Sequence, residues 1–270
     1  MNSGIQKLKC AEWLFGFDFD GTLADVSDNH SVSKQFFDTL KKVPVPFAWG
    51  ICTGRSLDFL LEGIEQASFP IYPDYIVAQE RDLFYQSSEG NYVPDEERNM
   101  LAKKELMKTL RKNSPVLSKV KDYIESSTEA TWIEIPEDPA GIIASNESEI
   151  QEAVKVFNNF SNKTDEIDFQ RNTIYLRFTH RNYCKGTAVK YLRKVFDIPW
   201  ANTLVMGDNY NDITMLNADV AKYYAAPSNS IDSLIIELRA NNGIIALNNY
   251  SRGVAEIIEK LVISETLESS

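Results

Sequence analysis

The sequence predicts an α/β protein whose sheet is mostly parallel and whose chain is interrupted by an inserted α+β module. Short, continuous apolar runs alternate with segments of helical spacing over residues 13–78 and again over 186–262. Continuous apolar runs that end at turn residues are typical of buried parallel strands, and their alternation with helices is typical of an α/β sheet. Between the two stretches this alternation is lost, which indicates the insertion.

The first stretch begins with residues 13–19, which are apolar almost throughout and stop at Asp20-Gly21-Thr22. Leu57, Leu60, Leu61 and Ile64 follow the i, i+3, i+4, i+7 spacing of a helix. In order, we expect strand 13–19, helix 32–43, strand 47–52, helix 57–64 and strand 75–78, with 83–85 as a hairpin partner of the last strand.

The insertion starts with a highly charged segment, 95–112, that predicts a mostly solvated helix. Two short strands (132–135 and 141–144), a helix (150–160) and an alternating strand (173–178) follow. We therefore expect a core domain formed by residues 1–89 and 183–270, and a cap domain formed by residues 90–182.

The α/β alternation then returns and predicts a helix over 186–196 and a strand over 203–206 that ends at Gly207-Asp208. The remaining elements are expected as strand 220–225, helix 231–238, strand 244–247 and helix 254–262.

Composition excludes several classes of protein. Acidic residues number 39 and basic residues 28 among 270, so the formal net charge of −11 argues against broad binding to a nucleic-acid backbone. No apolar run approaches the length of a membrane-spanning helix, and no signal peptide is visible. The three cysteines, Cys10, Cys52 and Cys184, are widely spaced and fit free thiols in a reducing compartment. We therefore expect a cytoplasmic protein without nucleic-acid or membrane partners, and no protein partner is evident.

Four polar segments lie where predicted strands end or helices begin: residues 18–22, residues 53–55, Lys185 and residues 207–212. Ligands bind at the carboxyl edge of the strands in open α/β sheets, so these segments are the candidate site.

Two carboxylates two positions apart, Asp18 and Asp20, could face one site if the chain turns at Gly21. One carboxylate could attack phosphorus and the other could move a proton to and from the reacting oxygens. Clustered carboxylates, with Asp208 as a third member, suit a hard divalent ion such as Mg²⁺. A pair that merely caps a turn is the alternative.

The other candidates each have a structural alternative. Thr53 and the Gly54 amide could hold a phosphate oxygen, while Thr53 could equally cap the next helix. Lys185 could supply positive charge to the transferring oxygens, although an isolated lysine is ordinarily solvated. Arg55 fits either a substrate pocket or a structural salt bridge, and Asn211 fits either a metal shell or a helix N-cap.

In order and position, the four segments resemble motifs one to four of the haloacid dehalogenase superfamily of phosphohydrolases. An insertion between motifs two and three resembles cap type 2B, the group of the Cof-type sugar phosphatases and sucrose-phosphate phosphatases. The resemblance implies a Rossmann-like core, a substrate-specificity cap and Mg²⁺. It implies Asp18 as nucleophile, Asp20 as acid/base and Lys185 as the third catalytic residue. Thr53, Gly54 and Arg55 would bind substrate, and the metal residues would be Asp18, Asp20 (through its carbonyl), Asp208, Asn211 and Asp212.

The chain departs from this pattern after the third strand. Many relatives carry Asn-Gly there, whereas this chain has Gln79-Glu80-Arg81-Asp82 in a loop that faces the substrate region in the family.

The predicted function is Mg²⁺-dependent hydrolysis of a small phosphomonoester, a sugar or sugar-acid phosphate, through an aspartyl-phosphate. One alternative is a phosphomutase, whose cap lies between motifs one and two in related enzymes, whereas only 33 positions separate Asp20 from Thr53. Another is a catalytically silent phosphometabolite-binding protein, which we would expect to have lost motif residues.

Overall fold

The computed structural model describes residues 3–135, 138–161 and 166–264. The chain divides into two compact units, one formed by Met1–Glu96 with Lys185–Ser270 and the other by Glu97–Cys184. The first division falls later than the expected boundary at residue 90, because strand β5 (Tyr92–Pro94) pairs with β4 (Asp82–Gln86) in the first unit.

The first unit contains an eight-stranded sheet in the order β12-β11-β10-β1-β2-β3-β4-β5. All neighbours from β12 to β3 pair in parallel, and β4 and β5 continue the sheet in antiparallel fashion. The remaining strands are β1 (Trp13–Phe17), β2 (Phe47–Cys52), β3 (Tyr75–Ala78), β10 (Thr203–Met206), β11 (Tyr223–Ala226) and β12 (Ile244–Ile245).

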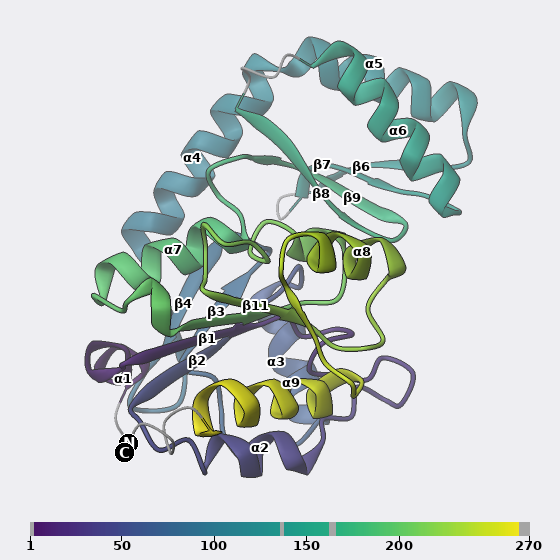
Figure 1. The fold of residues 1–270 in the computed structure, drawn as a ribbon. Helices are drawn as coiled ribbons and strands as arrows, with labels where there is room; N and C mark the ends of the chain where they lie inside the picture. Colours follow the sequence, from purple (N-terminus) through teal and green to yellow (C-terminus); the bar gives the residue numbers. More distant parts are fainter. Residues whose placement is uncertain (1–2, 136–137, 162–165, 265–270) are drawn as a thin grey trace. The chain divides into compact units, whose positions relative to one another are not determined.

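Helices cover both faces of this sheet, because successive side chains of its central strands point to opposite sides. Phe15 and Phe17 of β1 belong to the core under α2 (Lys34–Leu40), α3 (Leu57–Gln66) and α9 (Tyr250–Ile258). Leu14 belongs to the opposite core, under α1 (Gly4–Cys10), α7 (Lys185–Val195) and α8 (Asp232–Ala240). Figure 1 shows α2 and α9 on one side of the strands and α7 and α8 on the other. The arrangement confirms the predicted α/β class.

The register of the central strands brings the candidate segments to one edge. Phe17 at the end of β1 is the partner of Met206 on β10 and of Ile51 on β2. Because these pairs are parallel, the chain leaves all three strands at the same edge of the sheet. The segments that follow these strands therefore meet there, although the chain separates them widely.

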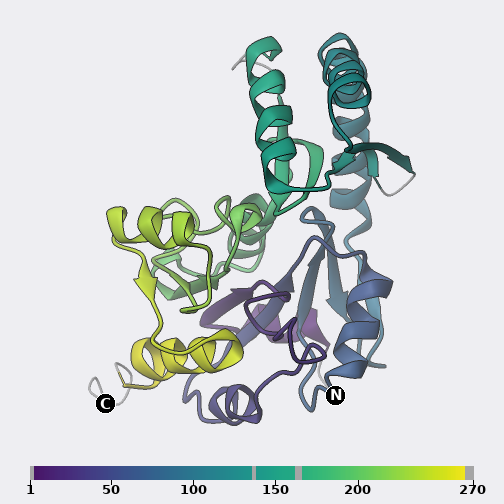
Figure 2. The ribbon, with the colours of Figure 1, turned by 90° about the vertical axis from the view of Figure 1, so that its right-hand side faces the viewer.

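The second unit has a four-stranded antiparallel sheet in the order β6-β7-β9-β8, with α5 and α6 packed on one face. Figure 2 shows these helices side by side, and Val120 and Phe157 on them contribute to a core with Ile142 and Phe178 of the sheet. Its elements are α4 (Glu96–Lys112), α5 (Ser114–Ser127), β6 (Thr131–Ile135), β7 (Asp138–Ile143), α6 (Glu147–Phe160), β8 (Ile167–Asn172) and β9 (Tyr175–His180).

Among the α-helices and strands of both units, four were not predicted: α1, the short strand β5, α5 and β8. Helices α1 and α5 bury few residues (Leu8 in α1; Leu117, Val120 and Ile124 in α5), so their apolar stripes are narrow. Strand β8 alternates Ile167 and Phe169 with polar residues, and its regular pairing with β9 comes only from the tertiary fold.

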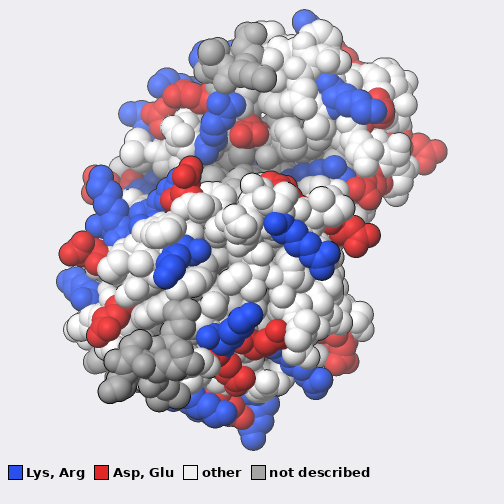
Figure 3. All heavy atoms as spheres, in the orientation of Figure 1, with Lys and Arg blue, Asp and Glu red and all other residues white. Residues whose placement is uncertain are grey.

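The surface agrees with the mixed composition. Figure 3 shows basic and acidic side chains interspersed over the visible face, without a large area of one sign. Within the described residues, no helix is both long and apolar enough to cross a membrane.

The tightest steric constraint in the central sheet gives a first prediction. A Cβ at Gly50 would lie 2.5 Å from three ring atoms of Tyr75, and this ring is fully buried. We expect Gly50→Ala to lower the free energy of unfolding by about 1–3 kcal/mol through overpacking, measured by chemical denaturation. Gly16→Ala, at the register partner of Gly50, is the matched control: its nearest contact would be the Tyr75 hydroxyl at 3.0 Å, so the loss should be smaller. Equal losses would contradict this explanation.

Candidate active site

The centre of the site is the ammonium group of Lys185, the first residue of α7, which is fully buried. Its Nζ atom donates hydrogen bonds of 2.7 Å to Asp18 Oδ1 and of 2.7 Å to Asp212 Oδ1. Asp18 follows β1 and Asp212 follows β10, so one cation joins segments that end two neighbouring strands. A solvated surface role for this lysine is thereby excluded.

Asp208 lies beside this pair and is held by its own contacts. The Thr22 hydroxyl donates to Asp208 Oδ1 at 2.7 Å. Gly21 has φ +83° and a Cβ there would lie 2.3 Å from Asp208 Oδ2, so only glycine fits. Asp212 completes the turn, because its Oδ2 accepts from the backbone amides of Asp208 at 2.9 Å and Asn209 at 3.0 Å. The N-cap of this short 3₁₀ turn is therefore Asn209, not Asn211.

Three of these acidic side chains fit a divalent cation. One carboxylate oxygen from each of Asp18, Asp208 and Asp212 lies within 4.8 Å of the others, and all three residues are buried. Asn211 Oδ1 is also buried and has no hydrogen-bond partner in the structure. Hard, clustered oxygen donors are the ligands that Mg²⁺ prefers. The residues present therefore fit the predicted metal.

Burial shifts the pKa values of this cluster. Desolvation, followed by the charge of Asp212, raises the pKa of Asp18 well above its ordinary value. The same two causes raise the pKa of Asp208 to about 7. Burial alone would lower the pKa of Lys185, but the carboxylates of Asp18 and Asp212 outweigh it and hold that pKa above the ordinary value. The pKa values of Asp18 and Asp208 stay raised although Lys185 lies beside them, so full ionisation of these carboxylates at neutral pH requires a further positive charge.

Asp20 has a different environment, and 26% of its side chain is exposed. Arg55 donates from Nε and Nη2 to its two oxygens, each at 2.6 Å. The guanidinium also stacks on the rings of Phe19 and Phe59, at 4.9 and 4.4 Å from their centres. His30 Nε2 lies 3.5 Å from Asp20 Oδ1. Arg55 therefore forms a salt bridge, and its partner is the predicted acid/base.

Thr53 and Gly54 follow β2 on the other side of β1. The Thr53 side chain is buried, and its Oγ1 accepts from the Arg55 amide at 3.1 Å. Its hydroxyl proton is free to donate in another direction, because this bond uses the oxygen only as an acceptor. The structure places Thr53 in a loop turn; the N-cap of α3 is Ser56, whose hydroxyl accepts from the Phe59 amide.

A residue that the sequence did not assign to the site also lies here. Glu80 is buried, and Asn211 Nδ2 donates to its Oε1 at 2.9 Å. A Cβ on Gly54 would lie 3.4 Å from the same oxygen. The only signal in the sequence was the departure from Asn-Gly after the third strand. Thr22 lies in the predicted segment 18–22 but was given no role of its own. His30 was not assigned, and no local pattern marks it.

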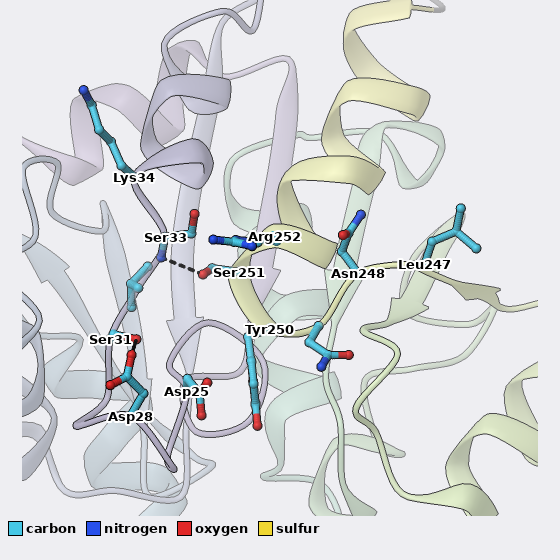
Figure 4. A pocket seen from close by; sticks show the side chains of 12 residues that line it. Asp25, Asp28, Ser31, Ser33, Lys34, Leu247, Asn248, Tyr250, Ser251 and Arg252 are labelled. Carbon is cyan, nitrogen blue, oxygen red and sulfur yellow. Dashed lines mark hydrogen bonds between the residues drawn. The ribbon is translucent and has the colours of Figure 1, made fainter.

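A polar hollow of about 790 Å³ lies in the same unit, between residues 25–34 and 247–252. Figure 4 shows Asp25 and Tyr250 in its lining, and the Ser33 amide donating to Ser251 Oγ at 2.8 Å. Asn229 connects this region to the site, since it donates to the Gly21 carbonyl at 2.7 Å and accepts from the Tyr250 amide at 2.8 Å. The lining of this hollow mixes acidic and basic side chains and does not hold the buried carboxylate cluster. We therefore assign the candidate active site to the cluster of Asp18, Asp208 and Asp212.

The comparison with protein families decides the class. The model of the haloacid dehalogenase-like hydrolases matches residues 15–133 and 74–258, which is most of the chain. The chain belongs to this family. This confirms the resemblance inferred from the four motifs.

A curated relative is the phosphoglycolate phosphatase of Methanobrevibacter smithii, which is 32% identical over 115 residues. The match covers 43% of this chain and 45% of that protein, so it spans less than half the length of either.

Several solved structures share the fold. The sucrose-phosphatase of Synechocystis sp. PCC6803, in complex with sucrose and phosphate, has a TM-score of 0.71 at 16% identity and covers 93% of this chain and 98% of its own. A subclass IIB sugar phosphatase has a TM-score of 0.59 at 15% identity, covering 92% and 98%. A haloacid dehalogenase-like hydrolase from Bacillus subtilis has a TM-score of 0.60 at 18% identity, covering 92% and 99%.

The raised pKa of Asp208 predicts a pH dependence of stability. Between pH 4 and about 7 the folded, metal-free protein keeps a proton that the unfolded chain loses, so stability falls as pH rises through this range. In EDTA we expect a lower Tm at pH 8 than at pH 6, and a smaller difference in Asp208→Asn. Added Mg²⁺ should raise Tm more at pH 8, because the cation competes with the proton. A Tm in EDTA that rises between pH 6 and pH 8 would contradict this prediction.

Proposed function

We propose that this protein is a Mg²⁺-dependent phosphatase that hydrolyses a small phosphomonoester, of the sugar phosphate class, through an aspartyl-phosphate. The observation that carries the proposal is the contact of Lys185 Nζ with Asp18 beside the buried Asp208 and Asp212. Membership of the haloacid dehalogenase-like hydrolases supports it.

In the first step, a carboxylate oxygen of Asp18 attacks phosphorus and the bond to the leaving oxygen breaks, which forms an acyl phosphate. Lys185 holds Asp18 by one oxygen and leaves the other to attack. The same ammonium group, with the Thr53 hydroxyl and the Gly54 amide, would stabilise negative charge on the transferring oxygens.

Asp20 would donate a proton to the leaving oxygen in this step. In the next step it would take a proton from the water that attacks phosphorus, while the bond to Asp18 breaks and inorganic phosphate is released. Its partial exposure suits this exchange, and the two bonds from Arg55 fix the direction of its carboxyl group. Two carboxyl groups two residues apart thus take different roles because their environments differ.

Asp18, Asp208 and Asp212, with the Asp20 carbonyl, would hold Mg²⁺, and Asn211 Oδ1 would complete or orient its shell. When bound, Mg²⁺ would neutralise charge on the carboxylates and the phosphate. The raised pKa of Asp18 makes such a neutralising charge necessary, since a protonated carboxyl group is a poor nucleophile.

We assign substrate selection to the inserted module, which has its own core. Of its arginines near β8 and β9, Arg171 pairs with Glu147 of α6 at 2.5 Å. Arg177 is paired in register with Gln170, on the sheet face opposite the one that α5 and α6 cover. Arg177 is therefore the more suitable candidate to contact substrate.

The three cysteines are free thiols, which supports a reducing compartment such as the cytoplasm.

Substitutions of the two carboxylates test the mechanism. Asp18→Asn should abolish phosphate release from an aryl phosphate, because an amide does not attack phosphorus. Asp20→Asn should still be phosphorylated slowly by this good leaving group but should release phosphate far more slowly, so that phosphoprotein accumulates. Both are measured by phosphate release with Mg²⁺ and with EDTA, and by intact-protein mass. Full activity of Asp18→Asn, or unchanged wild-type activity in EDTA, would overturn the proposal.

The Arg55 salt bridge gives a further prediction. Arg55→Lys keeps the charge but loses the two-fold bond to Asp20. We expect kcat to fall about 10-fold or more for an alkyl phosphate, whose leaving group needs a proton, and much less for an aryl phosphate. Equal losses on both substrates would show that Arg55 does not act through Asp20.

A further inference from the structure

The loop between β3 and β4 holds Glu80 in a fixed and strained conformation. Gln79 and Glu80 both have positive φ values, +48° and +64°. Their amides donate to the carbonyls of Arg55 and Thr53, each at 2.8 Å, so the loop is tied to the candidate phosphate-binding segment. A non-glycine residue in this conformation costs stability, and such strain is concentrated at functional sites.

The Glu80 side chain is only partly satisfied. It is 5% exposed, and Oε1 accepts a hydrogen bond from Asn211. Oε2 is buried and has no hydrogen-bond partner in the structure. A buried carboxylate oxygen without a donor is costly, so a donor from outside the chain is expected to meet it.

The surroundings of Glu80 contain an excess of negative charge. Five acidic side chains lie in the site: Asp18, Asp20, Asp208, Asp212 and Glu80. Lys185 donates to Asp18 and Asp212, and Arg55 donates to Asp20. Lys185, Arg55 and a divalent ion would together carry four positive charges against these five carboxylates, before the negative charge of the phosphate is added. The proposed mechanism gives roles to Asp18 and Asp20 but none to Glu80, so the negative charge of Glu80 calls for a separate explanation.

We propose that Glu80 selects substrates by the charge of the group that carries the phosphate: it accepts a hydroxyl or ammonium group close to the ester and disfavours a carboxylate there. This inference rests on the proposed phosphatase function and narrows it to phosphates of neutral or amino-substituted polyols, as opposed to phosphates of sugar acids.

The reason lies in the charges of the substrate. Phosphoryl oxygens are negative and require donors, so they do not satisfy Glu80 Oε2. The donors of a phosphomonoester are the hydroxyl or ammonium groups of its organic part. A carboxylate in that position would face Glu80 with like charge, which is an effective way to reject a wrong substrate.

Three compounds of nearly equal size test this: 2-hydroxyethyl phosphate (neutral), O-phosphoethanolamine (cationic) and phosphoglycolate (anionic). Each is measured with wild-type protein in Mg²⁺ as a substrate, or as a competitive inhibitor of aryl-phosphate hydrolysis where turnover is too slow. We expect the anionic compound to be at least about tenfold poorer than the other two, as like-charge contacts predict.

Glu80→Gln keeps the size and should reduce this discrimination by about fivefold or more. Glu89→Gln is the matched control, because it removes the same charge from an exposed turn between β4 and β5. If Glu80→Gln does not fold, the ranking of the three compounds with the wild-type protein still tests the predicted rejection of the anionic compound.

Phosphoglycolate performing as well as the neutral compound, or equal ratios in the two variants, overturns the role of Glu80. Absence of Mg²⁺-dependent hydrolysis of the aryl phosphate itself overturns the proposed function instead, so the two failures are distinguishable.

Discussion

The geometry of the site depends on the buried ammonium group of Lys185, which donates hydrogen bonds to both Asp18 and Asp212 in the interior of the first unit. A buried ion pair is a weak source of stability, but loss of one partner leaves an uncompensated charge and is strongly destabilising. The start of α7 and the ends of β1 and β10 are thereby held at one point. Asp212 extends this constraint, because its second oxygen accepts two backbone amides and fixes the turn that carries Asp208.

The two carboxyl groups of the first motif show how environment separates their roles. Burial and the acidic groups beside it raise the pKa of Asp18, and the contact with Lys185 favours its ionised form. Asp20 is more exposed, and both of its carboxylate oxygens accept hydrogen bonds from Arg55 in a neighbouring loop. Gly21, directly after Asp20, turns the chain through its positive φ value. Because it has no side chain, it also leaves room for the Asp208 carboxylate.

The inserted module has a hydrophobic core of its own, so its side chains can change without disturbing the carboxylate cluster. The loop that carries Glu80 differs in this respect. Its amides are bonded to Thr53 and Arg55, and its side chain to Asn211. An acidic side chain in this loop therefore lies directly beside the carboxylates of the candidate active site, which is the basis for the proposed role of Glu80 in substrate selection.

The sequence by itself determined the α/β class, the insertion and the four segments at the strand ends, because buried strands and their turns leave local signals in the chain. It did not determine which side chains meet. Thr22 bonds Asp208 across 186 positions, Asn211 bonds Glu80 across 131, and Arg55 bonds Asp20 across 35. It also missed α5 and β8, whose apolar stripes are weak until α6 and β9 pack against them. Only the tertiary structure decided these features, because they depend on parallel strand register and on burial, which no local pattern of residues encodes.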